Sequence, residues 1–325
     1  MASGPSIPIS GGTDMQAVEP GDQILPADFN EARTNINDML SAPTSVTDLH
    51  GLNQGGVSVG QAVTGISIDA LGSAGAFTEL QDDIQALNAF YVASTNVYIQ
   101  SDIVPGQMIN HNEWNGMMYD TQARWNDEEK TYIHSSKTNE TSQTWVVDND
   151  GAWTGLLTST VTFTWSSTAE LNAFFNGGGG VGIEGSLPNW TTGLPGQEQT
   201  DAWYDKLNSL GDVVLIKQNT AAGAGTNAGL GQVDMTTSYQ DLNVYAGGNA
   251  PYTSDWANVD AQVNNTTSPT SVTIRMQLRD GGDGGTDAPV EGDTRIRSVL
   301  YTPDPNGSGF TFASPTVSQT AITET

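Results

Sequence analysis

The stretch TSTVTFTWSSTAELNAFFNGGGGVGI, residues 158–183, contains the strongest local signals for the fold of this chain. In its first part, TSTVTFTW, small polar residues alternate with larger ones, which places Val161, Phe163 and Trp165 on one face of an extended segment. One apolar face and one polar face are typical of a strand that covers a core on one side. We therefore predict a half-buried β-strand over residues 158–165.

The residues after this strand predict a short helix with a defined beginning and end. Ser167 and Glu170 have the spacing of a capping box, which satisfies free backbone N–H groups at a helix start. Phe174 and Phe175 belong to its apolar face, and Gly177 is expected to take the left-handed conformation that ends the helix. After the glycine run, residues 181–183 are expected to return as a strand.

Another short helix and several strands are predicted downstream. Thr200 is expected to cap a helix that carries Trp203, Leu207 and Leu210 and stops at Gly211. Further strands are expected at residues 213–216, 272–278 and 295–301. Short strands between turn-rich loops favour an antiparallel sandwich over a parallel α/β sheet.

Upstream, the pattern is helical rather than extended. Residues 1–25 are rich in Gly, Pro and Ser and predict an arm that becomes ordered only against something else. A helix is predicted from Pro26 to just before Pro43, and a second one through Leu80, Ile84 and Leu87. From about residue 97 the pattern changes to short β-type runs, of which residues 97–99 are the first.

Together these patterns predict a mainly β fold, with an antiparallel β-sandwich-like body and a short helical N-terminal region. We expect residues 1–95 to form the arm and two helices, used for docking or assembly. Residues 96–231 are expected to form a β-rich domain that contains the Phe-Phe-Asn-Gly-Gly segment, and residues 232–325 a C-terminal β-rich part.

The charge balance points to a concentrated salt solution as the natural solvent. The chain has 37 Asp and Glu against 10 Lys and Arg, a formal net charge of −27. The Debye length falls to about 3 Å in molar salt, so carboxylates keep such a surface hydrated without long-range repulsion. We infer a halophilic protein. The alternative is an acidic protein from a mesophilic organism.

Several functional classes are disfavoured by composition. Binding of nucleic acid needs clustered Lys or Arg, which the sequence lacks. The absence of cysteine excludes disulfides and cysteine-based zinc sites. No stretch approaches the roughly 20 apolar residues of a membrane span, and the beginning MASGPSIPISGG does not resemble a signal peptide.

No catalytic residues are assigned from the sequence. His50, His111 and His134 form no metal-binding motif, and no nucleophile elbow or phosphate-binding loop occurs. Paired carboxylates of a glycoside hydrolase are weakly supported, because 37 acidic residues produce accidental pairs. This hydrolase alternative rests on those pairs and on aromatic residues expected to be exposed, namely Trp114, Trp125 and Trp153.

Two acidic loops are candidate Ca²⁺ or Mg²⁺ sites, because hard cations are bound by several oxygen ligands on a loop. One comprises residues 148–151, of sequence DNDG. The other contains Asp280, Asp283 and Asp287, followed by Glu291 and Asp293. Neither has the spacing of an EF-hand, and a solvated acidic surface is the simpler interpretation.

Residues 162–183, TFTWSSTAELNAFFNGGGGVGI, resemble a module of virion structural proteins of tailed viruses, notably of marine cyanobacterial myoviruses. In that module a strand runs into a Phe-Phe-Asn-Gly-Gly turn, which Phe174, Phe175, Asn176, Gly177 and Gly178 match. The phrase GDQILPADFNEARTNINDML, residues 21–40, is similar to the beginning of such proteins. The chain departs from that family in its acidity and its Gly- and Asn-rich loops.

The resemblance implies a structural component of a tailed-virus particle and not an enzyme. Tail or tail fibre is the favoured location, with roles in assembly and host-surface attachment. Other virion proteins, further copies in a homo-oligomer and a host surface glycan or surface layer are the implied partners. The charge balance adds a haloarchaeal host, in whose cytoplasm the protein would be made. Alternatives are a capsid decoration or turret protein and a haloarchaeal cell-surface glycan-binding module.

Overall fold

The computed structural model describes two compact units of the chain. The described residues are 6–8, 14–20, 24–41, 43, 45, 78, 80–85, 87, 111–125, 135–138, 142–145, 153–193, 196–247, 252–281, 289–303 and 312–325. One unit is helical and groups residues 1–44, 48–129 and 304–312. The other is the β-sandwich body, which groups residues 45–47, 130–303 and 313–325. The expected run at residues 97–99 lies outside the described residues.

The helical unit contains the predicted first helix, α1 (Pro26–Leu40). Pro26 suits the first turn, where no intrahelical N–H bond is lost, and the carboxylate of Asp28 accepts the N–H of Leu25 at 2.8 Å. Its apolar face is buried as predicted, with Phe29, Ala32, Ile36, Met39 and Leu40 inside. Residues 78, 80–85 and 87 are helical, in agreement with the second predicted helix.

A further helix, α3 (His111–Trp125), lies where β-type runs were expected. Trp114, Met117, Met118 and Thr121 are among its buried residues, and they recur at the three- and four-residue steps of one helical face. Asn115 and Gly116 interrupt the apolar residues in the sequence and weaken that signal. The β-type interpretation of this segment was therefore wrong.

Part of the N-terminal arm is ordered within the same unit. β1 (Ser6–Ile7) pairs with β2 (Met15–Gln16), and both Ile7 and Met15 are buried. The side chain of Asn115 on α3 accepts the N–H of Val18 at 2.8 Å and donates to its carbonyl at 2.9 Å. The partner that orders these arm residues is thus the helical unit itself.

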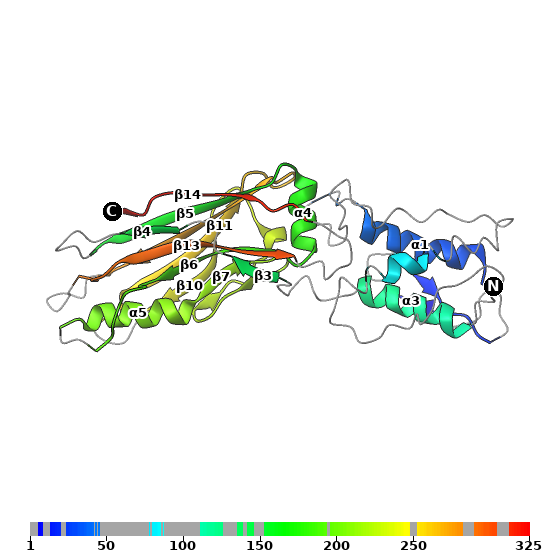
Figure 1. The fold of residues 1–325 in the computed structure, drawn as a ribbon, viewed down its shortest axis with the longest axis horizontal. Coiled ribbons are helices and arrows are strands. Elements are labelled where there is room, and N and C mark those ends of the chain that lie inside the picture. Colours follow the sequence, from blue (N-terminus) through cyan, green and yellow to red (C-terminus); the bar gives the residue numbers. More distant parts are fainter. Residues whose placement is uncertain are drawn as a thin grey trace. The chain divides into compact units, whose positions relative to one another are not determined.

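The body is an antiparallel sandwich of two sheets, which confirms the mainly β fold (Figure 1). The seven-stranded sheet has the order β14-β5-β12-β11-β10-β9, with β15 also paired to β5. Its strands are β5 (Leu156–Thr164), β9 (Thr226–Asn227), β10 (Gln240–Ala246), β11 (Trp256–Val263), β12 (Ser271–Arg279), β14 (Thr316–Gln319) and β15 (Thr323–Glu324).

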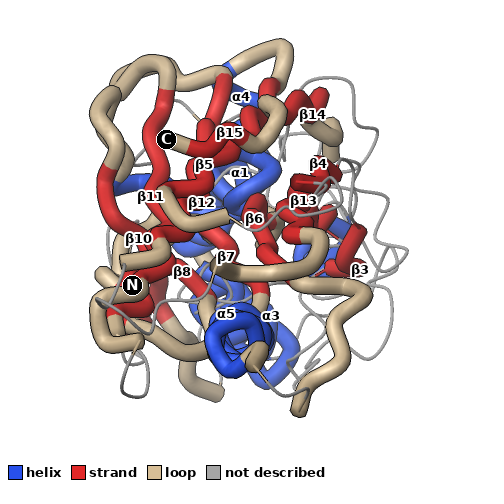
Figure 2. The backbone as a smooth tube through the Cα atoms, turned by 90° about the vertical axis from the view of Figure 1, so that its left-hand side faces the viewer, coloured by secondary structure: helices blue, strands red, loops and turns tan. Residues whose placement is uncertain are grey.

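The six-stranded sheet has the order β3-β13-β6-β7-β8, with β4 also paired to β13. Its strands are β3 (Ser135–Thr138), β4 (Ser142–Trp145), β6 (Gly180–Ser186), β7 (Asp212–Leu215), β8 (Thr220–Ala221) and β13 (Thr294–Pro303). Figure 2 looks along the strands and shows β10 and β11 to one side of β13 and β4. The main core of the body consists of buried side chains from both sheets, and a smaller cluster of Val214, Ile216 and Val299 is separate from it.

Within its described residues, the body also contains three helical segments: α4 (Thr168–Asn176), α5 (Glu198–Leu210) and the 3₁₀ turn η3 (Gln232–Asp234). Figure 1 shows α4 across one end of the sandwich and α5 lengthwise along it. Trp203 on α5 packs edge-on against Trp153, with ring centroids 4.9 Å apart. Gly211 ends α5, as predicted, and its φ is +60°.

The predicted cap of α5 was wrong. The helix begins two residues before Thr200, at Glu198, and the hydroxyl of Thr200 accepts the N–H of Glu291 at 2.8 Å. Thr200 is buried and therefore joins the helix to the segment before β13 rather than satisfying its own first turn.

The expected β-rich segments, residues 96–231 and 232–325, both contribute strands to each sheet. They therefore fold together rather than as separate parts that meet at residue 231. β5 pairs with β12 from Leu156↔Arg279 to Thr164↔Ser271, and β6 pairs with β13. Residues 111–125, expected in the first β-rich segment, belong to the helical unit. Such long-range pairing leaves no compositional trace at a boundary, which explains the difference.

The last residues of the chain form an edge of the seven-stranded sheet. β14 and β15 pair successively with β5, and Thr325 exchanges two backbone hydrogen bonds with Leu156, at 3.0 and 3.1 Å. The amide of Gln319 donates to the hydroxyl of Ser159 at 3.1 Å and to the carbonyl of Ile296 at 2.9 Å. Gln319 thereby connects the two sheets.

Candidate functional site

The segment that carries the family resemblance begins with a capped helix. The hydroxyl of Ser167 accepts the N–H of Glu170 at 3.2 Å, as the capping spacing predicts. The Glu170 carboxylate accepts hydrogen bonds from Ser166 rather than from Ser167, at 3.0 Å from its N–H and 2.5 Å from its hydroxyl. The start of α4 is thus satisfied by a variant of the expected box.

The two phenylalanines of this segment form the centre of an aromatic cluster. Phe174 and Phe175 are fully buried, and their ring centroids lie 5.5 Å apart in an edge-on arrangement. Trp165, at the end of the predicted strand, lies 5.2 Å from Phe174 and 5.8 Å from Phe175. Such arrangements stabilise a core beyond simple burial. The cluster joins β5 to α4.

The glycines of the segment let the chain turn back tightly into β6. Gly177 has a φ of −77°, so the predicted left-handed exit at this residue was wrong. Gly178 takes that conformation instead, with a φ of +80°. A Cβ atom on Gly179 would lie 2.5 Å from the ring of Phe174. Asn176 is buried at the helix end. This geometry supports a structural role for the segment, since its side chains pack and turn the chain.

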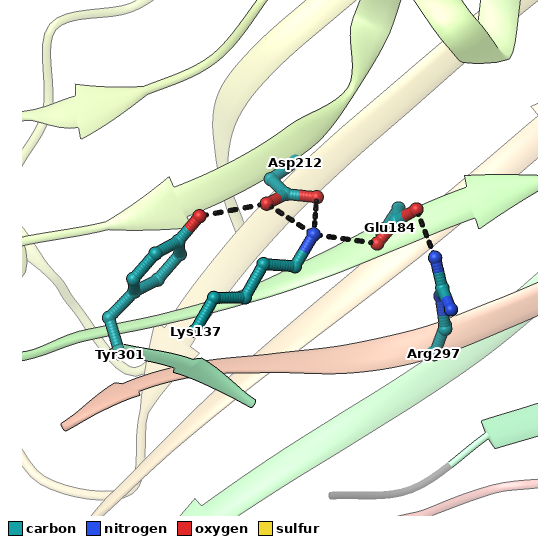
Figure 3. A network of polar contacts seen from close by, with 5 residues as sticks. All are labelled: Lys137, Glu184, Asp212, Arg297 and Tyr301. Atoms are coloured by element: carbon teal, nitrogen blue, oxygen red, sulfur yellow. Dashed lines mark hydrogen bonds and ion pairs between the residues drawn. The ribbon is translucent and has the colours of Figure 1, made fainter. Parts of the chain in front are cut away.

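A polar network crosses one face of the six-stranded sheet (Figure 3). Nζ of Lys137 on β3 lies 3.1 Å from the Glu184 carboxylate on β6 and 2.7 Å from Asp212 on β7. Tyr301 on β13 donates to Asp212 at 2.9 Å, and Arg297 on the same strand donates to Glu184 at 2.5 Å. Five side chains from four strands are therefore connected.

The strand register explains why these residues meet. Lys137 stands opposite Tyr301, Arg297 opposite Glu184, and Glu184 opposite Asp212. Two like charges directly opposite each other destabilise a sheet. The ammonium of Lys137 lies between the two carboxylates and offsets that repulsion.

The pKa values of Lys137 and Tyr301 in this network are both raised. Burial lowers the pKa of Lys137, but hydrogen bonds from its ammonium to Asp212 and Glu184 outweigh burial, and the net pKa is raised. Burial raises the pKa of Tyr301, and its hydrogen bond to Asp212 raises it further. Both groups hold their protons more tightly than in water, which suits a fixed structural network rather than proton transfer.

The candidate metal residues are only partly within the described residues. Asp283, Asp287 and the loop at residues 148–151 lie outside them. Asp280 is buried, and its carboxylate accepts the amide of Gln199 at 2.7 Å. The carboxylate of Glu291 accepts the amide of Gln197 at 2.6 Å. In the part of the chain that the structure describes, no three His, Asp or Glu side chains gather as metal ligands.

Two of the three aromatic residues that supported a hydrolase are not exposed as expected. Trp114 and Trp153 are fully buried, and the indole N–H of Trp153 donates to the Thr294 hydroxyl at 3.0 Å. The side chain of Trp125, like His50 and His134, is not among the described features. Trp153 packs on Trp203 because both complete the sandwich core.

Sequence reasoning missed the network residues Lys137, Glu184, Asp212, Arg297 and Tyr301. The alternation in RIRSVLY does place Arg297 and Tyr301 on one face of a strand, but the partners lie on other strands.

Among the described helices, none has the length and apolarity to cross a membrane.

Comparison with protein-family models, with curated proteins and with solved structures finds no match for this chain.

Proposed function

We propose that this chain is a structural component of a tailed-virus particle that infects a halophilic archaeal host. Tail or tail fibre is the favoured location. The observation that carries the proposal is the Phe-Phe-Asn-Gly-Gly segment, which resembles a module of this family. Residues 21–40, which resemble the beginning of such proteins, precede it in the expected order. The role of the segment is structural, because Phe174 and Phe175 are fully buried and Gly178 turns the chain.

The division into two units supports a role in assembly. The helical unit has its own buried cluster, which includes Phe29, Ile36 and Trp114, and the sandwich has a separate one. Two cores allow one unit to be fixed in a particle while the other presents a rigid surface. In this proposal the helical unit docks on other virion proteins and the sandwich faces outward. Closed symmetric copies are the usual form of such assemblies.

The charge of −27 supports the host assignment, because a carboxylate-rich surface remains soluble in concentrated salt. Host attachment follows from an outward sandwich, whose candidate receptor is a surface glycan or surface layer.

Purified particles provide the test. Peptides of this chain should be recovered by mass spectrometry from virions banded on a salt gradient, at a fixed ratio to the major capsid protein. Gold-labelled antibody should mark the tail. Label on the head would favour a capsid decoration or turret protein. Detection only in the surface fraction of uninfected cells would contradict the proposal and favour a cellular glycan-binding module.

A further inference from the structure

A pocket of about 320 Å³ lies between α5 and the end of β10. Asp205, Lys206 and Ser209 line it from the helix, and residues 245–247 line it from the strand. Small-molecule sites usually have volumes of about 300–1,000 Å³, so this pocket has room for one small ligand. None of its residues belongs to the polar network or to the Phe-Phe-Asn-Gly-Gly segment.

The most distinctive group in the pocket wall is a buried cation. Lys206 is only 5% exposed, and its Nζ donates to the backbone carbonyl of Asp255 at 2.8 Å. Nζ also lies 4.9 Å from the ring centroid of Trp203 and 5.5 Å from that of Tyr245. Burial lowers the pKa of Lys206, and the charge of Asp255 opposes this only in part. The charged form of Lys206 is therefore less favoured here than in water.

Three other cations of the body contact carboxylates directly. Lys137 contacts Glu184 and Asp212, Arg275 contacts Asp260, and Arg297 contacts Glu184. Among the described residues, the hydrogen-bond acceptor of Lys206 is instead a neutral carbonyl. A buried charge is stabilised by an opposite charge or by several hydrogen bonds. An ammonium has three donors, so a ligand carboxylate would supply what the site lacks.

The other residues that line the pocket favour a ligand that carries hydroxyl groups in addition to a negative charge. Asp205 and Ser209 are four residues apart on α5 and both exposed, so their side chains lie on one face of the helix. A carboxylate and a hydroxyl bind hydroxyl groups well, while Asp205 repels a ligand with several negative charges. Tyr245 adds a partly buried ring with an apolar face and a polar tip.

We propose that this pocket binds a carboxylated monosaccharide unit, with its carboxylate on Lys206 and its hydroxyl groups on Asp205 and Ser209. The ring of Tyr245 bounds the apolar side of the sugar. The inference goes beyond the proposed particle role, because binding is a property of the sandwich whether or not the chain is found in virions.

Calorimetric titration of the full chain in molar sodium chloride, with glucuronate, glucose and acetate as probes, tests this inference. Glucuronate should bind at least tenfold more tightly than glucose or acetate, since only glucuronate presents both groups. Equal affinity for acetate and glucuronate would overturn the proposal, as would absence of glucuronate binding at millimolar concentration.

Variants assign the contacts. Lys206→Met should reduce glucuronate affinity at least tenfold, to the level of glucose, and Ser209→Ala should weaken it severalfold. Asn208→Ala is the matched control, because Asn208 is exposed on the same helix but does not line the pocket. An unchanged affinity in Lys206→Met would refute the assignment.

A measurement on the unmodified chain covers the case in which Lys206→Met does not fold. The NMR-detected pKa of Lys206 should rise on saturation with glucuronate, because a bound carboxylate favours the ammonium. A pKa that glucuronate leaves unchanged would contradict the proposal. Virion mass spectrometry reports the particle role separately, so failure of one is distinguishable from failure of the other.

Discussion

Nζ of Lys137 lies 2.7 and 2.8 Å from the two carboxylate oxygens of Asp212, although strands β13 and β6 separate β3 from β7 in the sheet. The long lysine side chain thus connects strands that share no backbone hydrogen bond. Because Tyr301 donates to the same carboxylate, two groups that titrate in alkali share one acceptor.

Stability should decline above about pH 10 through this network. The folded-state pKa values of Lys137 and Tyr301 lie above their ordinary values of 10.5 and 10.0. The folded protein then holds more protons than the unfolded chain, so the free energy of unfolding falls as pH rises. Urea unfolding of a Lys137→Met, Tyr301→Phe double variant should show a shallower alkaline decline. Tyr119→Phe, at an exposed tyrosine of the helical unit, is the control and should keep the original slope.

Gly178 should tolerate asparagine better than alanine. Its φ of +80° costs an alanine about 1–2 kcal/mol, whereas asparagine enters this region more readily. Gly193→Ala, at a φ of +85° with no atom within 4 Å of an added Cβ, reports the backbone strain alone. Denaturant midpoints compare the three variants. Equal stability of the alanine and asparagine variants at residue 178 would contradict the assignment.

Gly179 and Phe174 should be energetically coupled. An added Cβ at Gly179 would meet the Phe174 ring at 2.5 Å, so Gly179→Ala should destabilise the body by about 1–3 kcal/mol. In a Phe174→Leu background the same substitution should cost less, with a coupling energy above about 0.5 kcal/mol. Phe175→Leu is the matched control, because its ring is not among the atoms nearest that Cβ. Strict additivity with Phe174→Leu would exclude the steric explanation.

Removal of residues 313–325 should produce self-association. The deletion exposes the backbone edge of β5 and removes Ile322 from the core, and unpaired edges attract other strands. Light scattering after size-exclusion chromatography should show dimers or larger species at lower stability. Thr323→Ala, an exposed change within β15, should remain like the full chain. A monomeric, equally stable deletion variant would show that these strands contribute little.

Low ionic strength should lower the melting temperature. The Debye length grows from about 3 Å at 1 M salt to about 30 Å at 0.01 M, so repulsion among the carboxylates behind the charge of −27 returns. Calcium should stabilise more than sodium at equal ionic strength if Asp280, Asp283 and Asp287 share an ion, whereas screening alone gives no excess. Melts that do not change between molar and low salt would contradict the halophilic assignment.

Helices, strands and turns that depend on neighbouring residues in the sequence were predictable, whereas contacts that depend on strand register were not. The helix at Pro26, the strand predicted over residues 158–165 and observed as Leu156–Thr164, and the stop at Gly211 follow from periodicity and backbone preference. Helix α3 was missed because Asn115 and Gly116 break its apolar pattern, although Trp114 and Met118 carry the spacing.

The left-handed residue was misplaced by one position because either glycine satisfies the sequence pattern, and only the packing of the turn selects Gly178 over Gly177. Lys137 and Asp212 are 75 residues apart, so no local pattern reports their contact. The burial of Lys206 could likewise not be predicted, because its neighbours Asp255 and Tyr245 come from distant parts of the sequence.

The interleaving of the two units along the chain has a consequence for proteolysis. The backbone passes between the groupings after Thr44, Thr47, Glu129, Pro303 and Phe312. A single backbone cut at one of these passages therefore leaves the two units covalently joined through the others. Proteases would therefore separate the sandwich from the helical unit only after they had cut the chain at several places.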